Sequence, residues 1–267
     1  MELQVVGHRA GWPDVKSPTS AYLVFAESAT ILLDCGAGVT SVLRDLIDVQ
    51  DLDGIWISHM HPDHCFDLQI LAMVRSYQRN SVQPRDRNET GRCPLYLPIG
   101  ATEKVKAVNE LYQADTPEYQ YFNSMFTDEF ECIEYSPRDT LKLGDCTMQT
   151  MPMVHAGGSS AIRISDAEGK SIVYSGDTGW CDQLVDLATG ADLLVCETTV
   201  DEPDKSGQGH LCAREAGRVA AESGTEHLLL THFFDVTDDA LRQRVQDASS
   251  LYDGRVTLAE VRKSIAV

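Results

Sequence analysis

The chain has 267 residues, of which 43% are hydrophobic, and this is enough to form a sizeable core in one large domain. Its 41 acidic residues outnumber its 22 basic residues and give a formal net charge of -19. Because nucleic-acid-binding proteins usually carry basic faces, this charge argues against a protein that holds a phosphate backbone by bulk electrostatics. We expect a single domain that spans residues 1–267.

Short apolar runs that end in Asp, Gly or His recur along the chain and alternate with segments of helical periodicity. We expect strands at residues 21–25, 30–33, 54–58, 95–97, 147–154, 161–164, 171–174, 193–196 and 228–231. We expect helices at residues 37–47, 65–77, 102–112, 213–223 and 237–248. This order favours the α/β class, with two sheets packed face to face under outer helices.

The segment 76–131 fits this scheme least well, because prolines and glycines interrupt it. It also carries a cluster of aromatic residues, namely Tyr112, Tyr119, Tyr121, Phe122, Phe126 and Phe130. One interpretation is an irregular but packed excursion. The other is a lid or a dimer surface beside an active site, since long connections in compact domains are often functional.

Cysteine usage and the lack of apolar spans bear on the cellular compartment. The eight cysteines are scattered, and none forms a CxxC pair. The N-terminal segment lacks the basic and apolar regions of a signal peptide, and no apolar run approaches the roughly 18 residues of a membrane span. Free cysteines in such a chain are typical of a reducing compartment. The sequence therefore predicts a cytoplasmic protein without membrane association.

The segment His59-Met60-His61-Pro62-Asp63-His64 holds three imidazoles and a carboxylate within six positions. A histidine in a protein core usually occurs alone, whereas three crowded imidazoles repel one another when they are charged. A metal ion removes this repulsion because it binds the neutral rings. The cluster therefore predicts a metal site.

The spacing within this segment predicts two ions rather than one. His59 and His61 alternate in an extended segment that leaves a strand, so both side chains can face one point. Pro62 begins a helix, and Asp63 and His64 in its first turn can face a second point nearby. Two divalent ions about 3.5–4 Å apart need such paired sets of ligands.

Three further candidates follow predicted strands. Asp177 stands in a Gly-Asp-Thr-Gly turn, where glycine allows a close backbone approach, and it is the best candidate for a carboxylate that bridges two ions. Alone, such a turn would be ordinary. His155 and His232 each leave an apolar strand. Either histidine alone would more often be structural, but beside an incomplete ligand set we expect both to bind metal.

With these residues the chain resembles the metallo-β-lactamase superfamily and, within it, the ribonuclease Z-like branch. The resemblance covers nearly the whole chain, and it implies a four-layer αβ/βα sandwich with the site at the edge of both sheets. It implies that Asp177 bridges two ions. The ligands that it implies are His59, His61 and His155 for one ion, and Asp63, His64 and His232 for the other.

The resemblance also implies roles around the ligands. Asp34, in a Leu-Asp-Cys-Gly motif, matches a carboxylate that orients ligands. His210, in a Gly-His-Leu-Cys motif, resembles a histidine that protonates the leaving group, with Glu215 as the candidate to orient it; otherwise His210 is an ordinary loop histidine. Asp63 would take a proton from the attacking water while it binds metal.

The chain departs from the branch in its first loop, where His8 and Arg9 replace small residues. These two side chains either reach a substrate or belong only to the loop, and we favour the loop. The implied reaction is hydrolysis, in which two ions lower the pKa of a water molecule between them. Imidazole and carboxylate ligands favour two Zn²⁺ ions, with Mn²⁺ or Fe as alternatives. The branch also implies a homodimer.

The short interval between His155 and Asp177 bears on the substrate. In the usual bacterial ribonuclease Z a basic arm for transfer RNA lies there, but here a predicted hairpin fills the interval. We therefore expect a small-molecule substrate rather than transfer RNA. The stretches 174–188 and 194–197 resemble small bacterial proteins that include a cyclic-nucleotide phosphodiesterase. We favour a phosphodiesterase; the alternatives are a lactonase or thioesterase of specialised metabolism and a metal-bound sensor or binding protein.

Overall fold

Two seven-stranded sheets form the centre of the molecule in this computed structural model, which describes residues 1–81, 91–111 and 120–267. The first sheet contains β1 (Glu2–Gly7), β2 (Ala21–Phe25), β3 (Thr30–Leu33), β4 (Gly54–Trp56), β5 (Cys93–Pro98), β6 (Phe130–Tyr135) and β14 (Ser264–Ala266). The second contains β7 (Thr140–Leu143), β8 (Cys146–Met153), β9 (Ser159–Ser165), β10 (Ser171–Tyr174), β11 (Leu193–Glu197), β12 (His227–Thr231) and β13 (Arg255–Leu258).

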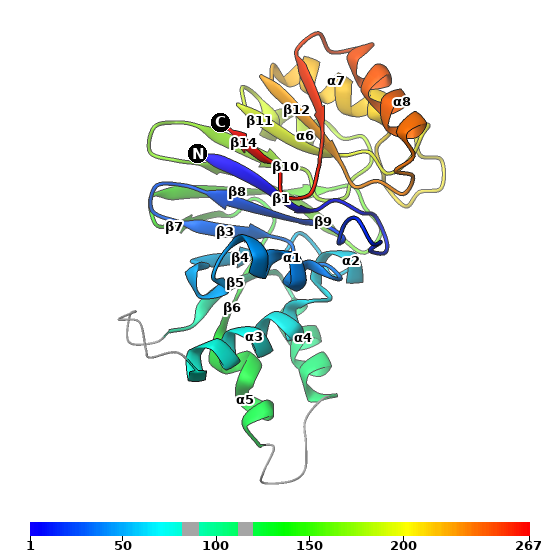
Figure 1. Ribbon diagram of the computed structural model, residues 1–267. Coiled ribbons are helices and arrows are strands. Elements are labelled where there is room, and N and C mark those ends of the chain that lie inside the picture. Colours follow the sequence, from blue (N-terminus) through cyan, green and yellow to red (C-terminus); the bar gives the residue numbers. More distant parts are fainter. Residues whose placement is uncertain (82–90, 112–119) are drawn as a thin grey trace.

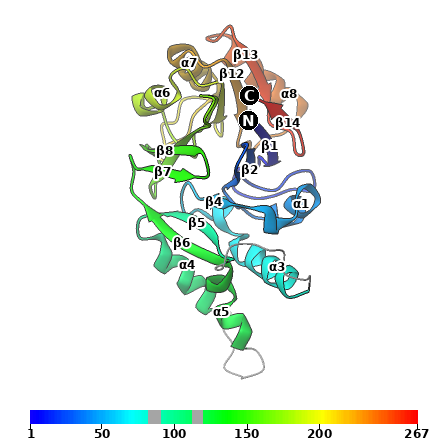
Figure 2. The same ribbon diagram turned by 90° about the vertical axis from the view of Figure 1, so that its left-hand side faces the viewer.

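Helices cover the outer face of each sheet (Figures 1 and 2). The helices are α1 (Val39–Leu46), η1 (Val49–Asp51), α2 (Pro62–Cys65), α3 (Leu68–Ser81), α4 (Ala101–Glu110), α5 (Gln120–Glu129), α6 (Asp182–Ala188), α7 (Ala213–Ser223) and α8 (Asp238–Ser249). Helices α6, α7 and α8 lie over the second sheet, and α1, α3, α4 and α5 lie beyond the first. The expected four-layer sandwich is therefore confirmed. Within the described ranges, none of the helices has the length and apolar character of a membrane span.

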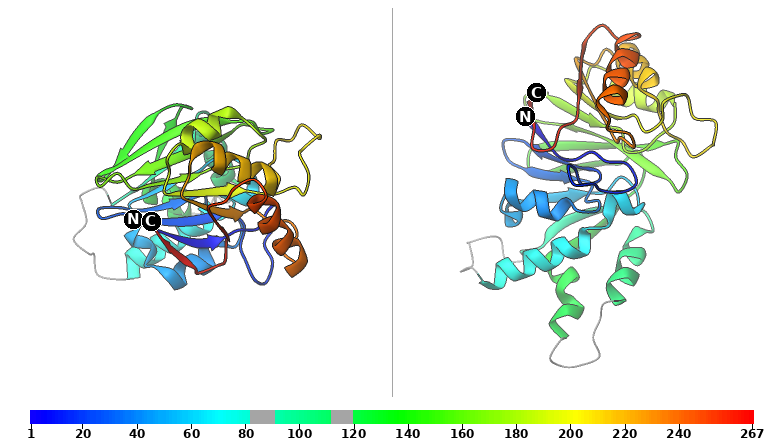
Figure 3. Two further views of the ribbon diagram at one scale, coloured as in Figure 1. Left: turned by 90° about the horizontal axis from the view of Figure 1, so that it is seen from above. Right: turned by 45° about the vertical axis from the view of Figure 1, so that its right-hand side comes forward.

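The two sheets share one plan. Strands β3 to β6 are parallel, as are β10 to β13, and each set continues into antiparallel strands. The antiparallel pair β1–β14 brings the two ends of the chain side by side (Figure 3). Strands β3, β4, β8, β10, β11 and β12 all lead at their carboxyl ends into loops that carry polar residues of one site. Ligand sites in α/β sheets usually lie at such ends.

Burial explains why the strands are apolar runs rather than alternating patterns. In β2, Tyr22 and Val24 belong to the core between the sheets, whereas Leu23 belongs to the core under the helices of the first sheet. Because both faces of this strand are covered, both sets of side chains must be apolar. The two clusters hold the sheets in fixed positions, and this determines where the loops at their edges meet.

The segment 76–131 is more regular than expected in the part that the structure describes. It forms β5, α4, α5 and the start of β6, and Phe126 and Phe130 pack into the core under the first sheet. For these residues the predicted irregularity is wrong, whereas the predicted packing is confirmed. Tyr112 and Tyr119, two members of the predicted aromatic cluster, lie outside the described residues.

Candidate metal centre

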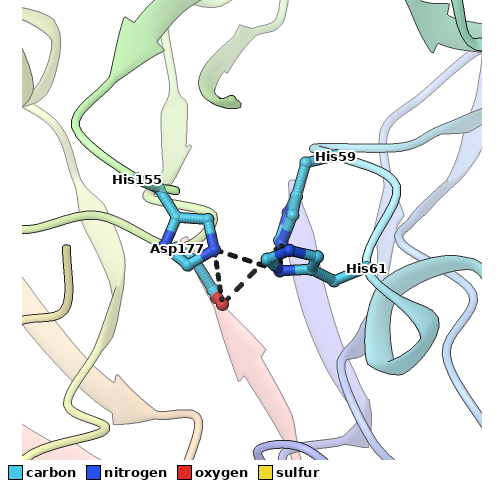
Figure 4. Close-up of side chains that lie close together, drawn as sticks. All are labelled: His59, His61, His155 and Asp177. Atoms are coloured by element: carbon cyan, nitrogen blue, oxygen red, sulfur yellow. Dashed lines mark hydrogen bonds and ion pairs between the residues drawn. The ribbon is translucent and has the colours of Figure 1, made fainter. Parts of the chain in front are cut away.

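Four side chains from three loops converge on one point at the edge of the sandwich (Figure 4). His59 and His61 follow β4, His155 follows β8, and Asp177 follows β10. His61 Nδ1 lies 3.0 Å from His59 Nε2 and 3.1 Å from His155 Nε2. Asp177 Oδ2 lies 3.9 Å from His59 Nε2 and 3.8 Å from His155 Nε2. One oxygen and three ring nitrogens thus surround a common point.

A second group of side chains lies directly beside the first. It comprises Asp63 and His64 of α2 and His232 after β12. His232 Nε2 lies 3.3 Å from Asp63 Oδ2 and 3.5 Å from Asp177 Oδ1. His64 Nε2 lies 3.7 Å from Asp63 Oδ2 and 3.3 Å from Asp177 Oδ1. Asp177 therefore directs one carboxylate oxygen toward each group.

These residues fit two divalent cations. His64 Nε2 and Asp177 Oδ1 are buried and have no hydrogen-bond partner among the described residues, although buried polar atoms normally have one. Burial and the neighbouring His64 hold the pKa of His59 well below its ordinary value, so that ring stays neutral and can bind metal. Burial acts to raise the pKa of Asp177, but His232 and His64 hold it well below its usual range, so this carboxylate stays charged.

Asp34 fixes the side of the site that belongs to the first sheet. Its carboxylate accepts hydrogen bonds from Ser58 N at 2.7 Å, Ser58 Oγ at 2.9 Å and Tyr174 OH at 2.7 Å. His64 Nδ1 donates to Asp34 Oδ2 at 2.7 Å. This leaves the Nε2 lone pair of His64 directed at the centre, as a carboxylate behind a ligand histidine should. Asp34 adopts a positive φ of 58° as it leaves β3.

Glu197, at the end of β11, has the same role on the second sheet. His210 Nδ1 donates to Glu197 Oε1 at 2.9 Å, and Thr178 N donates to the same oxygen at 2.8 Å. Thr199 Oγ1 donates to Glu197 Oε2 at 2.5 Å and lies 2.7 Å from His232 Nδ1. The backbone of His232 has a positive φ of 62°. One buried carboxylate thus positions His210, His232 and the residue after Asp177.

The carboxylate expected to orient His210 is the one correction that the structure makes at this site. Glu215 accepts a hydrogen bond from Cys212 N at 3.1 Å and caps the start of α7, so Glu197 replaces it as the partner of His210. Burial acts to lower the pKa of His210, but the hydrogen bond and charge of Glu197 raise it to about 9. The position of Glu197 at the end of an apolar strand was the sequence signal that could have identified it.

The structure of the first loop decides whether His8 and Arg9 reach a substrate or belong only to the loop. Arg9 is buried, and its Nε lies 3.4 Å from Asp14 Oδ2. The His8 ring packs on Phe233 at 5.4 Å between ring centroids, and burial lowers the pKa of His8 to about 4. Neither side chain lines the cavity at the centre. Both therefore belong to the structure of the loop.

A cavity of about 360 Å³ opens onto the two groups of side chains. His210 lines it together with four residues that the sequence analysis did not identify: Gly11, Ala156, Gln208 and Phe234. Gly11 N donates to Asp63 Oδ2 at 2.8 Å, so the first loop reaches the centre through its backbone. Because backbone contacts of this kind leave no pattern of residue types, they cannot be predicted from the sequence alone.

Comparison with known proteins assigns the family. The beta-lactamase superfamily domain matches residues 29–233. The chain belongs to this superfamily. This metallo-β-lactamase-fold chain is 33% identical to an uncharacterized protein of Mycobacterium leprae, over 90% of this chain and 79% of the relative. It is 29% identical to the probable metallo-hydrolase YhfI of Bacillus subtilis, over 97% of each chain.

Solved structures agree with this assignment. The crystal structure of YhfI from Bacillus subtilis matches with a TM-score of 0.82 at 26% identity, over 99% of this chain and 98% of the other. The short form of human tRNase Z matches with a TM-score of 0.74 at 22% identity, over 100% and 99%. The latter likeness shows the fold alone. The predicted resemblance to the metallo-β-lactamase superfamily and its ribonuclease Z-like proteins is confirmed.

Proposed function

We propose that the protein is a binuclear metal-dependent phosphodiesterase that hydrolyses a small substrate such as a cyclic nucleotide. The observation that carries this proposal is the position of Asp177 between two groups of ligand-type side chains, with His210 on the wall of the same cavity. A phosphodiester needs both features, because its attacked group carries negative charge and its leaving oxygen needs a proton.

In the proposed centre His59, His61 and His155 would hold one ion. Asp63, His64 and His232 would hold the other, and Asp177 would contact both. Imidazole-rich sets with carboxylates favour zinc, with manganese and iron as the alternatives to test. Two such ions supply charge stabilisation at the phosphoryl group and lower the pKa of an attacking water molecule.

Two side chains of the chain itself would move protons. Asp63 lines the cavity and, with its Oδ2 held by Gly11 N, is placed to accept a proton from attacking water. His210 lines the same cavity, and its Nδ1 is bound to Glu197. Its Nε2 is therefore the atom that would donate a proton to the departing oxygen.

The interval between His155 and Asp177 supports a small substrate. Its described residues form β9, a turn and β10, and they belong to the second sheet. The net charge of -19 also opposes binding of a polynucleotide backbone. A cavity of about 360 Å³ is of the size that accepts a small molecule.

The test is a substrate panel on protein loaded separately with zinc, manganese or iron. We expect hydrolysis of 3′,5′-cyclic AMP and bis(p-nitrophenyl) phosphate, and no hydrolysis by the Asp63→Ala variant. Cleavage of lactones or thioesters without either phosphodiester would overturn the proposal in favour of a lactonase or thioesterase. Retention of the biological role by Asp63→Ala would instead indicate a metal-bound sensor or binding protein.

We further propose that the protein acts as a homodimer. Four large apolar side chains are exposed at helical spacing from the end of α2 along α3: Phe66, Ile70, Met73 and Tyr77. An exposed apolar stripe of this kind suits a two-fold interface, in which the same patch of each copy is buried against the other. We expect light scattering to give the mass of a dimer, and Ile70→Glu with Tyr77→Glu to give a monomer. A monomeric wild-type protein at all concentrations contradicts the proposal.

A further inference from the structure

Two exposed aromatic rings pack together beside the cavity, and one of them lines it. Trp12 is 61% exposed and Phe234 is 43% exposed, yet their rings pack together at 5.4 Å between centroids with an angle of 40° between their planes. Phe234 lines the cavity itself, two residues after the candidate ligand His232. Large apolar rings left open to water beside a polar site commonly mark a binding surface.

The backbone holds this pair in a fixed position relative to the candidate ligands. Ala10 N donates to Phe233 O at 3.1 Å, and Phe233 N donates to His8 O at 3.0 Å, so the first loop and the segment after β12 are joined. Gly11 donates to Asp63 and has a positive φ of 71°. A Cβ atom at Gly11 would lie 3.0 Å from Phe234 Cε1, so a glycine permits this close approach.

Gln208 contributes a polar group to the cavity. Its backbone oxygen accepts a hydrogen bond from Ala156 N at 2.8 Å, and this fixes the position of its backbone. Its side-chain amide makes no hydrogen bond to any residue within the described ranges, and it lines the cavity with Phe234. An amide both donates and accepts, which suits the edge of a heterocycle.

We propose that Trp12 and Phe234 form a stacking subsite for a nucleobase, and that Gln208 contacts the edge of that base. The substrate class is therefore a nucleoside phosphodiester, with its phosphate at the two groups of ligands and its base on the aromatic pair. This inference rests on the proposed phosphodiesterase function. Stacking on an aromatic ring stabilises any nucleobase, because every base has a planar π-face, so the subsite selects for a planar ring rather than for one particular base.

Ligand binding tests the subsite without relying on turnover. We would titrate metal-loaded protein with AMP and with ribose 5-phosphate in a calorimeter. The wild type should bind AMP about 10-fold more tightly, because only AMP carries a base. Trp12→Ala and Phe234→Ala should each reduce this ratio toward one, whereas Trp12→Phe should retain most of it. Val15→Ala, a fully exposed residue in the same loop, is the matched control and should leave the ratio unchanged.

Equal affinity of the wild type for the two ligands overturns the subsite, as does an unchanged ratio in both alanine variants. Kinetics with two esters of the same leaving group provide the second measurement. Phe234→Ala should raise the KM of adenosine 5′-(p-nitrophenyl phosphate) about 10-fold more than that of methyl p-nitrophenyl phosphate. If the enzyme cleaves neither ester but still prefers AMP, the proposed phosphodiesterase function fails while the nucleobase subsite stands.

Discussion

The two halves of the sandwich contribute to the candidate centre in different ways. The first sheet contributes a single segment, in which His59, His61, Asp63 and His64 lie within one loop and one turn of helix. The second sheet contributes one residue at the end of each of several strands, so that its groups meet only when the sheet has formed. Each group of ligand-type side chains takes two members from the first segment and the others from the second sheet, so the complete centre requires both sheets to be docked.

The two halves also differ in the carboxylates that orient the histidines of the centre by hydrogen bonds. Asp34 contacts one ligand histidine directly, whereas Glu197 acts on His210 directly and on His232 through Thr199. In the first half, the side chains are held together because they are close in the sequence. In the second half, the carboxylate of Glu197 holds together side chains that come from separate strands. The predictions below test this division.

The largest effect is expected for Asp177→Ala, because this side chain faces both groups. We expect loss of bound metal and a fall in kcat/KM on the order of a thousandfold with bis(p-nitrophenyl) phosphate. Metal content by mass spectrometry and initial rates are the measurements. The matched control is Asp182→Ala at the exposed start of α6. Two ions per chain and normal turnover in Asp177→Ala would remove this residue from the centre.

His210→Ala should have the next largest effect, because its proposed role is to protonate the leaving oxygen. We expect kcat for cyclic AMP to fall by about 100-fold or more. The loss should be smaller for p-nitrophenyl esters, whose leaving group needs no proton. Metal content should not change. Loss of an ion in this variant would instead make His210 a ligand, since its ring also lies near Asp177 and His232.

Asp34→Asn tests the first half of the comparison. The amide keeps the shape of the side chain but weakens the hydrogen bond that fixes His64. We expect metal affinity to fall by about 10-fold to 100-fold, the usual result of changing a partner behind a ligand. Competition with a chelator measures the affinity, and circular dichroism checks the fold. Unchanged affinity in a folded variant would contradict this role.

Glu197→Gln and Glu215→Gln form a matched pair with the smallest expected effects. Glu197→Gln should lower kcat by about 10-fold, because it weakens the hold on His210. Glu215→Gln should leave kcat unchanged and lower the free energy of unfolding by about 0.5–1 kcal/mol, because Glu215 caps α7. Chemical denaturation and steady-state kinetics separate the two. An activity loss confined to Glu215→Gln would instead support the sequence-based prediction that Glu215 orients His210.

The sequence predicted the layers and most long elements, because buried strands covered on both faces are short apolar runs. It missed five strands, β1, β6, β7, β13 and β14, and two helices, α5 and α6. It also ran the end of α2 and the start of α3 together in one predicted helix. In β7 alternate residues are exposed, so only pairing with β8 defines the strand. Such pairing depends on tertiary structure and leaves little pattern in a single segment.

The residues of the candidate centre could be predicted where they cluster in one short segment or directly follow a predicted strand. The structure brings together His59, His61, Asp63, His64, His155, Asp177 and His232, as the spacing and the family resemblance indicated. The prediction that Glu215 orients His210 was wrong. Glu215 is nearer to His210 in the sequence, but Glu197 is the carboxylate that contacts the His210 ring. Gly11 and Phe234 were missed because their contribution depends on how two distant loops join.

Asp34 and His232 stand on opposite sheets, and both have a positive φ, of 58° and 62°. A residue with a Cβ atom in this conformation costs about 1 kcal/mol relative to glycine. Glycine at either position would relax the backbone and at the same time delete a carboxylate or an imidazole from the site. At Asp34 the buried donors of Ser58 and Tyr174 would then lack a partner, and this loss outweighs the relief of backbone strain, so the residue that orients a ligand also stabilises the fold.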